Sequence, residues 1–310
     1  MKRAFVTGVT GYIGGSVARR LLQEGYHVTG LVRTPEASER VAAQGIHPVV
    51  GQIDDGALLS RCARAADVVV NAADMAHRGA VEALVEGMRG TNKTLVHTSG
   101  SSIVSEFGEG ELSERVFEDD TPFSPDPPKV GSVAINRLVQ DSARQGVRGV
   151  VICPPMIYGR GTGSKRDSIQ VPALIQLSLA QQAGVHLGRG LNVWSNVHID
   201  DLVDLYSLVI ARAQPGDFFF AEAGEARFLD IAAAISRMLG YGGRTVSWPI
   251  AEAIAAFGED AVRYSGASNS RVRATRARRL GWAPKHTSLL HEIEQGSYRE
   301  DFARPSDPAR

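Results

Sequence analysis

The stretch TGVTGYIG, from Thr7 to Gly14, decides the fold of this chain. It follows the apolar run KRAFVT and precedes SVARRLLQEGY, whose apolar residues recur at helical spacing. In such a strand–turn–helix unit, Gly8 permits the tight turn, Gly11 lets the backbone approach a pyrophosphate, and Gly14 lets helix and strand pack closely. Because the helix N-terminus adds unpaired N–H groups, we expect a dinucleotide site rather than a glycine-rich turn without a ligand.

Apolar runs and amphipathic stretches alternate through the first two-thirds of the chain. Strands are expected at AFVT, HVTGLVR, HPVVG, DVVVNAA, TLVHTS and GVVICPP, and helices at 16–23, 35–44, 56–65, 79–91 and 130–145. This pattern predicts an α/β, Rossmann-type doubly wound parallel sheet with a smaller C-terminal substrate lobe. We expect an NAD(P)-binding domain at 1–158, a mainly substrate-binding lobe at 159–300 with room for one return of the chain, and a polar tail at 301–310.

The charge balance argues against several classes of partner. The 310 residues include 34 Lys and Arg and 34 Asp and Glu, so the formal net charge is zero. Neither a nucleic acid nor an anionic membrane surface is therefore expected as the main ligand. The apolar runs are far shorter than a membrane span, and two cysteines, Cys62 and Cys153, do not make a disulfide framework. We expect a cytoplasmic protein.

Six motifs in order resemble the extended short-chain dehydrogenase/reductase family, in its epimerase/dehydratase branch. The glycine turn is similar to TGxxGxxG, DVVVNAA (67–73) to the fourth-strand signature, and HTSGSS (97–102) to the Ser/Thr cluster. CPPMIYGRG (153–161) resembles RPxxVYGxG, NVHIDDL (196–202) resembles HVDDV, and RATRARRLGWAPK (273–285) resembles the ending LGW.P. The resemblance runs from residue 2 to about residue 297 and implies an NAD(P)-binding protein with a small-molecule substrate.

The end of the second expected strand, LVR, indicates the cofactor. An acidic residue there would bond a free ribose 2′-hydroxyl, whereas an arginine accommodates a 2′-phosphate. Arg33 therefore predicts NADP in preference to NAD, unless it is a solvated surface charge. In GQIDD, Gln52 and Ile53 are placed to meet the adenine, and Asp54 or Asp55 to cap a helix. The expected cofactor-binding residues are Gly8, Thr10, Gly11, Tyr12, Ile13, Gly14, Arg33, Gln52, Ile53, Asn71, Ala72, Ala73, Thr98, Pro154 and Ile157.

The acid/base pair usual in this family is absent from the sequence. The resemblance implies a tyrosine, with a lysine four residues later whose charge lowers the pKa of that tyrosine. None of the seven tyrosines has a lysine at the fourth following position. Matching AINRLV to the family pattern places Pro128 at the tyrosine position and Ser132 at the lysine position. The chain thus resembles the atypical members of the family.

Other residues are candidates for the missing chemistry. The hydroxyl groups of residues 98–102 end a strand, at the edge where ligands bind in such sheets. Ser99, Ser101 and Tyr158 are the candidate catalytic residues. Lys129 precedes a helix and is a weaker candidate, and His97 is expected to point into the core.

Three further features allow two interpretations each. His198, Asp200 and Asp201 have the composition of a metal or acid/base site, but in the family this element joins the two halves, so no metal is expected. The segment GRGTGSKRD (159–167) has the composition of a lid. A group of arginines either lies on a solvated face or reaches an anionic substrate: Arg263, Arg271, Arg273, Arg276, Arg278 and Arg279.

Two functions follow from these observations. The leading hypothesis is an NAD(P)-dependent oxidoreductase or epimerase-like enzyme that moves hydride to or from a carbonyl or alcohol carbon. The alternative is a non-catalytic NAD(P)-binding redox sensor or scaffold, which the missing tyrosine and lysine favour. Since family members often dimerise through two helices, here 79–91 and 130–145, a homodimer is also expected.

Overall fold

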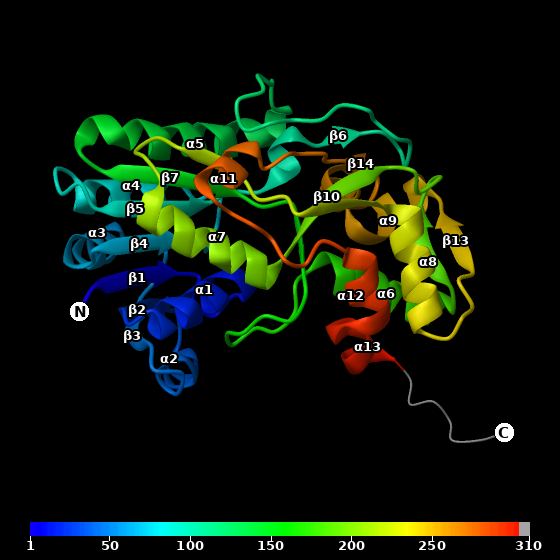
Figure 1. The fold of residues 1–310 in the computed structure, drawn as a ribbon, viewed down its shortest axis with the longest axis horizontal. Helices are drawn as coiled ribbons and strands as arrows, with labels where there is room; N and C mark the ends of the chain where they lie inside the picture. The colour runs from blue at the N-terminus through cyan, green and yellow to red at the C-terminus, as the bar shows by residue number, and fades with distance from the viewer. Residues whose placement is uncertain (304–310) are drawn as a thin grey trace.

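The computed structural model describes residues 1–303, and its larger part is built on a seven-stranded parallel sheet (Figure 1). The strand order is β11-β7-β5-β4-β1-β2-β3. These strands are β1 (Arg3–Thr7), β2 (His27–Val32), β3 (His47–Val50), β4 (Val68–Asn71), β5 (Thr94–Thr98), β7 (Arg148–Cys153) and β11 (Phe218–Phe220). Because β1 pairs with both β2 and β4, the order reverses beside it, and ligands of such sheets bind at the carboxyl ends of the strands there.

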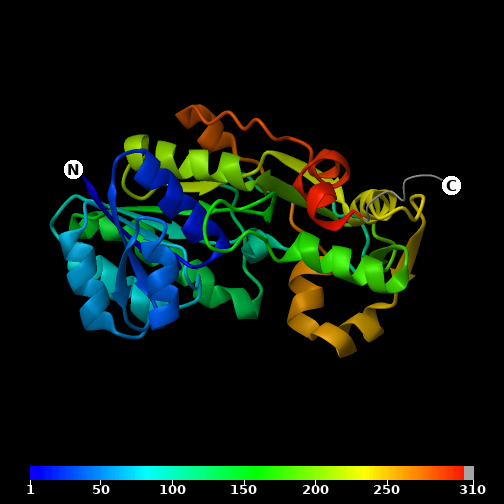
Figure 2. The same cartoon turned by 90° about the horizontal axis from the view of Figure 1, so that it is seen from below.

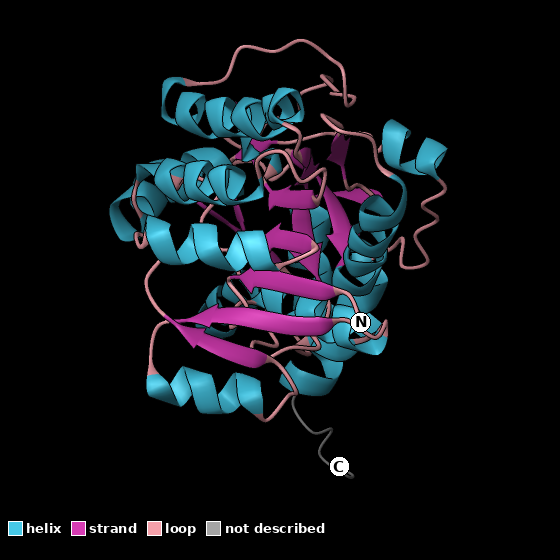
Figure 3. Ribbon diagram, turned by 90° about the vertical axis from the view of Figure 1, so that its left-hand side faces the viewer, coloured by secondary structure: helices cyan, strands magenta, loops and turns pink. Residues whose placement is uncertain are grey.

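Helices cover both faces of this sheet (Figure 3). One face packs against α1 (Tyr12–Gln23), α2 (Pro35–Ala42) and α7 (Ile199–Arg212). The other packs against α3 (Gly56–Ala65), α4 (Arg78–Met88) and α5 (Val130–Asp141). The buried Val, Leu and Ile runs of the strands are what a sheet covered on both sides requires. The predicted Rossmann-type doubly wound fold is confirmed.

The smaller part consists of short sheets and helices, seen on the right of Figure 1. One sheet holds β8 (Met156–Tyr158), β10 (Val193–His198) and β12 (Gly224–Arg227), a second holds β9 (Gly184–Leu187) and β13 (Thr245–Trp248), and a third holds β6 (Glu106–Phe107) and β14 (Ser268–Asn269). Its helices are α6 (Gln170–Gln181), α8 (Phe228–Met238), α9 (Ile250–Phe257), α10 (Glu259–Ala261), the π-helical turn η4 (Val262–Gly266), α12 (Leu289–Gln295) and α13 (Ser297–Phe302).

The chain returns to the larger part twice, where the sequence suggested one return. The first return is α7 and β11, which pairs with β7. The second is α11 (Thr275–Leu280), whose buried side chains join those of α1 and α7. Of the predicted polar tail, residues 301–302 belong to α13, and residues 304–310 lie outside the described part. No helix within residues 1–303 combines the length and the apolar character needed to span a membrane.

Candidate cofactor and active site

Close packing requires glycine at two of the three motif positions, Gly8 and Gly14, and leaves space beside the third, Gly11. Gly8 has a φ of +70°, and a Cβ on it would lie 2.4 Å from the carbonyl oxygen of Ala72. A Cβ on Gly14 would lie 2.3 Å from the carbonyl oxygen of Gly8. At Gly11 the added atom meets just that Gly8 oxygen, at 3.1 Å, and otherwise faces open space. The turn is closed toward the protein and open at Gly11, which fits the approach of a pyrophosphate.

Helix α1 presents its free N–H groups at the same place. Gly11 is its N-cap, and no side chain in the described part of the chain caps it. The helix begins four residues before the predicted start, so its first turn includes Ile13 and Gly14, with Thr10 just before the cap. Uncapped N–H groups and the positive end of the helix dipole attract an anion. These residues therefore fit the phosphates of a dinucleotide.

The ends of β2 and β3 carry the residues expected to choose the cofactor. Arg33 directly follows β2, is exposed, and forms no ion pair with any of residues 1–303. Gln52 is also exposed, whereas Ile53 is half-buried and packs on the side chains under α3. Asp55 caps α3 by accepting a 2.9 Å hydrogen bond from a backbone N–H, as predicted. A positive side chain is thus available where a 2′-phosphate would lie.

The end of β4 differs from the prediction at Asn71. Thr7 Oγ1 donates to Asn71 Oδ1 at 2.5 Å, and Asn71 Nδ2 pairs with His97 Nδ1 at 3.0 Å. Because both ends of this buried amide are engaged inside the sheet, its side chain does not reach the cofactor, which corrects the prediction. At this strand end, the backbone of Ala72 and Ala73, which borders Gly8, remains available to contact a cofactor.

His97 is a core residue, as expected. Its side chain is fully buried, and burial lowers its pKa to about 4. The imidazole is therefore neutral at physiological pH. Its Nε2 has no hydrogen-bond partner within residues 1–303.

Two of the predicted hydroxyl groups at the end of β5 bond within the protein. Thr98 Oγ1 lies 2.6 Å from the hydroxyl of Tyr206 on α7. Ser101 Oγ lies 2.7 Å from Ser270 Oγ, and the Ser101 N–H donates to the carbonyl of buried Pro154 at 3.0 Å. Ser101, predicted as catalytic, is 1% exposed. Because its hydroxyl is both buried and paired, the catalytic prediction is corrected.

Ser99 and Ser102 remain at this edge. Asn136 Nδ2 on α5 donates to Ser99 Oγ at 2.9 Å, so Ser99 keeps its own proton, although its side chain is almost fully buried. Ser102 lies in η1 (Ser101–Val104), is half-exposed, and its hydroxyl has no side-chain partner among the described residues. Of the predicted hydroxyl groups at 98–102, that of Ser102 belongs to the one side chain that is partly exposed.

Tyr158 is in the core and not at the site. Its hydroxyl donates a 2.9 Å hydrogen bond to the carbonyl oxygen of His286, and its ring is fully buried. Burial raises the pKa of this phenol far above its usual value. The proton is committed to a backbone acceptor, so the prediction of Tyr158 as a proton donor is corrected. Ile157, its neighbour on β8, is buried in the cluster under α1 and α7.

No tyrosine–lysine pair forms at the start of α5. Pro128 lies in the 3₁₀ turn η2 (Pro127–Lys129), and Ser132 is buried in the first turn of α5. Lys129 Nζ lies 4.2 Å from the centre of the Tyr264 ring, and burial lowers the pKa of this lysine. Lys129 therefore points toward η4 in the smaller part.

The glycine-rich segment 159–167 is fastened along α1. The hydroxyl of Tyr12 reaches the carbonyl oxygens of Tyr158 and Gly159 at 3.0 and 2.8 Å, so just the backbone of Tyr12 is left to meet a cofactor. Ser16 Oγ accepts from the N–H of Thr162 at 3.2 Å. Opening of this segment as a lid would break these contacts.

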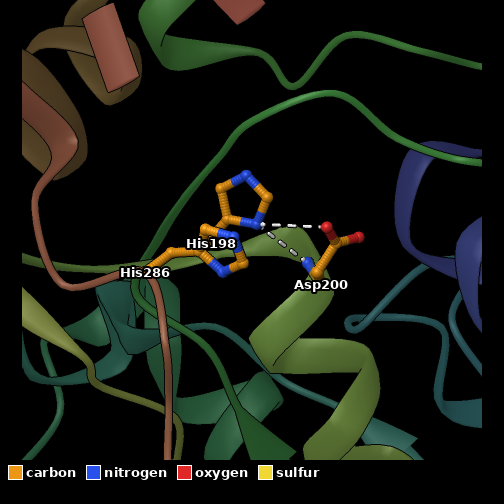
Figure 4. A group of neighbouring side chains, drawn as sticks. All are labelled: His198, Asp200 and His286. Atoms are coloured by element: carbon orange, nitrogen blue, oxygen red, sulfur yellow. Dashed lines mark hydrogen bonds and ion pairs between the residues drawn. The ribbon is translucent and has the colours of Figure 1, made fainter. Parts of the chain in front are cut away.

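His198, Asp200 and His286 form a cluster at the start of α7 (Figure 4). His198 Nδ1 accepts from the N–H of Asp200 at 3.2 Å and so caps α7, and its ring stacks on that of His286 at 4.0 Å. Asp201 accepts from the backbone N–H groups of Lys285 and His286 at 2.9 and 2.7 Å. A metal bound at Nδ1 of His198 would remove the hydrogen bond that caps α7. The geometry therefore favours the structural interpretation of this cluster.

Most of the C-terminal arginines are neutralised by acidic partners. Arg271 and Arg273 both bond Glu225, at 2.9 Å each, and Arg278 bonds Glu222 at 3.0 Å. The remaining pairs are Arg263 with Asp126 and Glu259, and Arg276 with Asp217. Arg279 is exposed and has no acidic partner among residues 1–303. These arginines therefore do not form a patch of unpaired positive charge that could bind an anionic substrate.

The family model for the NAD dependent epimerase/dehydratase family matches residues 4–219. The chain belongs to this family. Its description as NAD dependent agrees with the open glycine turn.

Two relatives of this epimerase/dehydratase family member are named for redox chemistry. Oxidase ucsJ of an Acremonium species is 31% identical, over 94% of this chain and 96% of its own. A Stigmatella aurantiaca ketoreductase, named for 4-hydroxy-2-methyl-3-oxo-4-farnesyl-3,4-dihydroquinoline-1-oxide, is 27% identical over 72% of this chain and 68% of its own. The solved UDP-glucose 4-epimerase of Thermotoga maritima shares the fold, with a TM-score of 0.76 at 18% identity over 96% of this chain and 98% of its own.

Proposed function

We propose that this family member transfers hydride between NADP(H) and a carbonyl or alcohol carbon of a small molecule. The observation that carries the proposal is the turn closed at Gly8 and Gly14 but open at Gly11, beside the uncapped end of α1. The exposed Arg33 beyond β2 supports the 2′-phosphate form. The relatives named as an oxidase and a ketoreductase support redox chemistry.

A bound nicotinamide would supply or accept the hydride, and the protein must position the other reactant. Ser102 is half-exposed in the turn that follows β5, and in this proposal its hydroxyl bonds the oxygen of the carbonyl or alcohol. The hydroxyl groups of Thr98, Ser101 and Tyr158 are held in internal bonds. Ser99 is almost fully buried and bonded to Asn136, so it is not proposed as the proton donor either. The proton therefore passes through Ser102 or water.

Oxidation of NADPH with a panel of aldehydes, ketones and keto sugars tests this function. We expect turnover, and we expect Ser102→Ala to lower kcat/KM by about 10- to 100-fold with the Kd for NADPH unchanged. Ser60→Ala, a half-buried serine on α3, serves as the matched control. Tight NADPH binding without turnover of any compound would instead favour the non-catalytic sensor or scaffold.

We also propose a homodimer through α4 and α5, which lie side by side in the larger part. These two helices carry the half-exposed side chains of Ala83, Ala134 and Leu138, and Val130 is 52% exposed. Burial of such apolar groups drives association. Light scattering should give a dimer mass that Leu138→Arg reduces to a monomer mass, and a monomeric wild type would contradict the proposal.

A further inference from the structure

A cavity of about 450 Å³ lies in the smaller part, away from the glycine turn. Helix α6 and strand β9 form one wall, and α9 through η4 form the other; in Figure 2 these are the green helix and the orange helices below it. The volume is in the range of pockets that hold small organic ligands. Representative lining residues are Leu174, Leu177, Leu187, Phe228, Phe257 and Val262.

The lining is apolar and carries no Lys, Arg, Asp or Glu. Its polar side chains are those of Gln170, His186 and Ser265, and burial lowers the pKa of His186, so that imidazole is uncharged at neutral pH. A diphosphate is bound most strongly by cationic side chains, and this lining carries none. The cavity is therefore unsuited to the charged part of a sugar nucleotide.

Two of the lining side chains are large, apolar and exposed. Ile169, just before α6, is 73% exposed, and Phe257, at the end of α9, is 48% exposed, so each wall supplies one. Large apolar side chains kept in water at the rim of an apolar hollow mark a ligand-binding groove.

The turn η4 contributes side chains to this cavity and to a second hollow. Val262 lines the cavity, while the next residue, Arg263, lines a second hollow of about 290 Å³. That hollow is also lined by Ile103 and Val104 of η1, which directly follow Ser102. The turn η4 therefore borders both the apolar cavity and the hollow beside η1.

We propose that this cavity binds the apolar part of the substrate, an alkyl, prenyl or fused-ring group, while its carbonyl or alcohol carbon lies toward Ser102. The inference rests on the proposed function for the reacting carbon, but the binding of an apolar group does not depend on turnover.

Binding of the neutral fluorophore N-phenyl-1-naphthylamine tests the cavity directly. Wild type should bind it, Ala173→Trp in the α6 wall should weaken binding at least tenfold, and UDP should not displace it. Ala255→Trp is the matched control, because Ala255 is exposed on α9 and does not line the cavity. Unchanged NADPH binding in both variants shows that they fold. Absence of binding to wild type, or equal binding to Ala173→Trp, would overturn the proposal.

Reduction of straight-chain 2-alkanones with NADPH separates the two proposals. We expect kcat/KM to rise about fourfold for each added CH₂ until the cavity is filled, and Ala173→Trp to abolish that rise. If wild type binds the fluorophore, Ala173→Trp does not, and wild type reduces no alkanone, the cavity proposal stands and the proposed function is contradicted. Reduction without any chain-length dependence, and without fluorophore binding, would uphold the function and overturn the cavity proposal.

Discussion

Asn136 on α5 donates a 2.9 Å hydrogen bond to the hydroxyl of Ser99 at the end of β5. The amide oxygen of Asn136 is buried and has no partner within residues 1–303. The start of α5 is where the family resemblance places the acid/base pair, and here an amide fastens that helix to the strand. The Asn136–Ser99 contact is thus a structural bond beside the site.

Substitution of Asn136 should affect stability and not cofactor binding. Asn136→Ala removes the donor to Ser99 inside the core, and we expect the free energy of unfolding to fall by about 1–3 kcal/mol. Urea denaturation measures the change, and NADPH affinity should stay within about twofold. The exposed neighbour gives the control, since Arg137→Ala should change stability by less than about 0.5 kcal/mol. Equal stability of the two variants would contradict the account.

The two glycines Gly11 and Gly14 should respond differently to alanine. A Cβ at Gly11 meets one atom at 3.1 Å, so Gly11→Ala should fold but bind NADPH at least about tenfold more weakly, because the methyl group occupies the side open to phosphate. Gly14→Ala should fold poorly, since its Cβ would lie 2.3 Å from a backbone oxygen. Thermal unfolding and fluorescence titration distinguish these effects. A Cβ added at Gly131 on α5 would face open space, so Gly131→Ala should lower neither the stability nor the affinity for NADPH.

Tyr158→Phe tests the assignment of Tyr158 to the core. The variant loses one hydrogen bond to the His286 carbonyl, and we expect a stability loss of about 1 kcal/mol. Turnover per folded molecule should be unchanged at each pH. A hundredfold loss of kcat in a fully folded variant would show that this phenol is catalytic after all.

Stability should fall as the pH drops from 6.5 toward 4, in part because of His97. The folded protein holds the pKa of His97 at about 4, below the unfolded value of 6.5, by burial. Between these values the unfolded state binds a proton that the folded state does not, so unfolding is favoured at lower pH, by up to about 3 kcal/mol. Urea denaturation between pH 4.5 and 7.5 gives the slope of the unfolding free energy against pH. In His97→Gln this slope should correspond to the uptake of up to one proton fewer on unfolding. Identical slopes would contradict a buried neutral His97.

Local patterns predicted the fold and the glycine turn well. Strand and helix periodicity gave the parallel sheet, and the spacing of Gly8, Gly11 and Gly14 gave the turn, because these features depend on neighbours in sequence. The cap at Asp55 is local in the same way.

Long-range contacts explain what the sequence could not predict. The partner of Tyr158 is 128 residues away, and that of Thr98 is 108 residues away, so their hydroxyl groups looked free. The apolar cavity combines residues 169–187 with 228–266, and no single motif marks it. Asn136 did carry a signal, because it stands in AINRLV where the family pattern has an acidic residue.

The most direct test of the account is a fluorescence titration with NADPH and with NADH of wild type, Arg33→Ala and the control Arg144→Ala. Arg144 lies after α5, near the start of β7 and far along the chain from the glycine turn. We predict that wild type binds NADPH more tightly than NADH, and that Arg33→Ala weakens NADPH binding at least about tenfold while NADH binding and Arg144→Ala stay unchanged. Failure of wild type to bind either cofactor would contradict the proposed site.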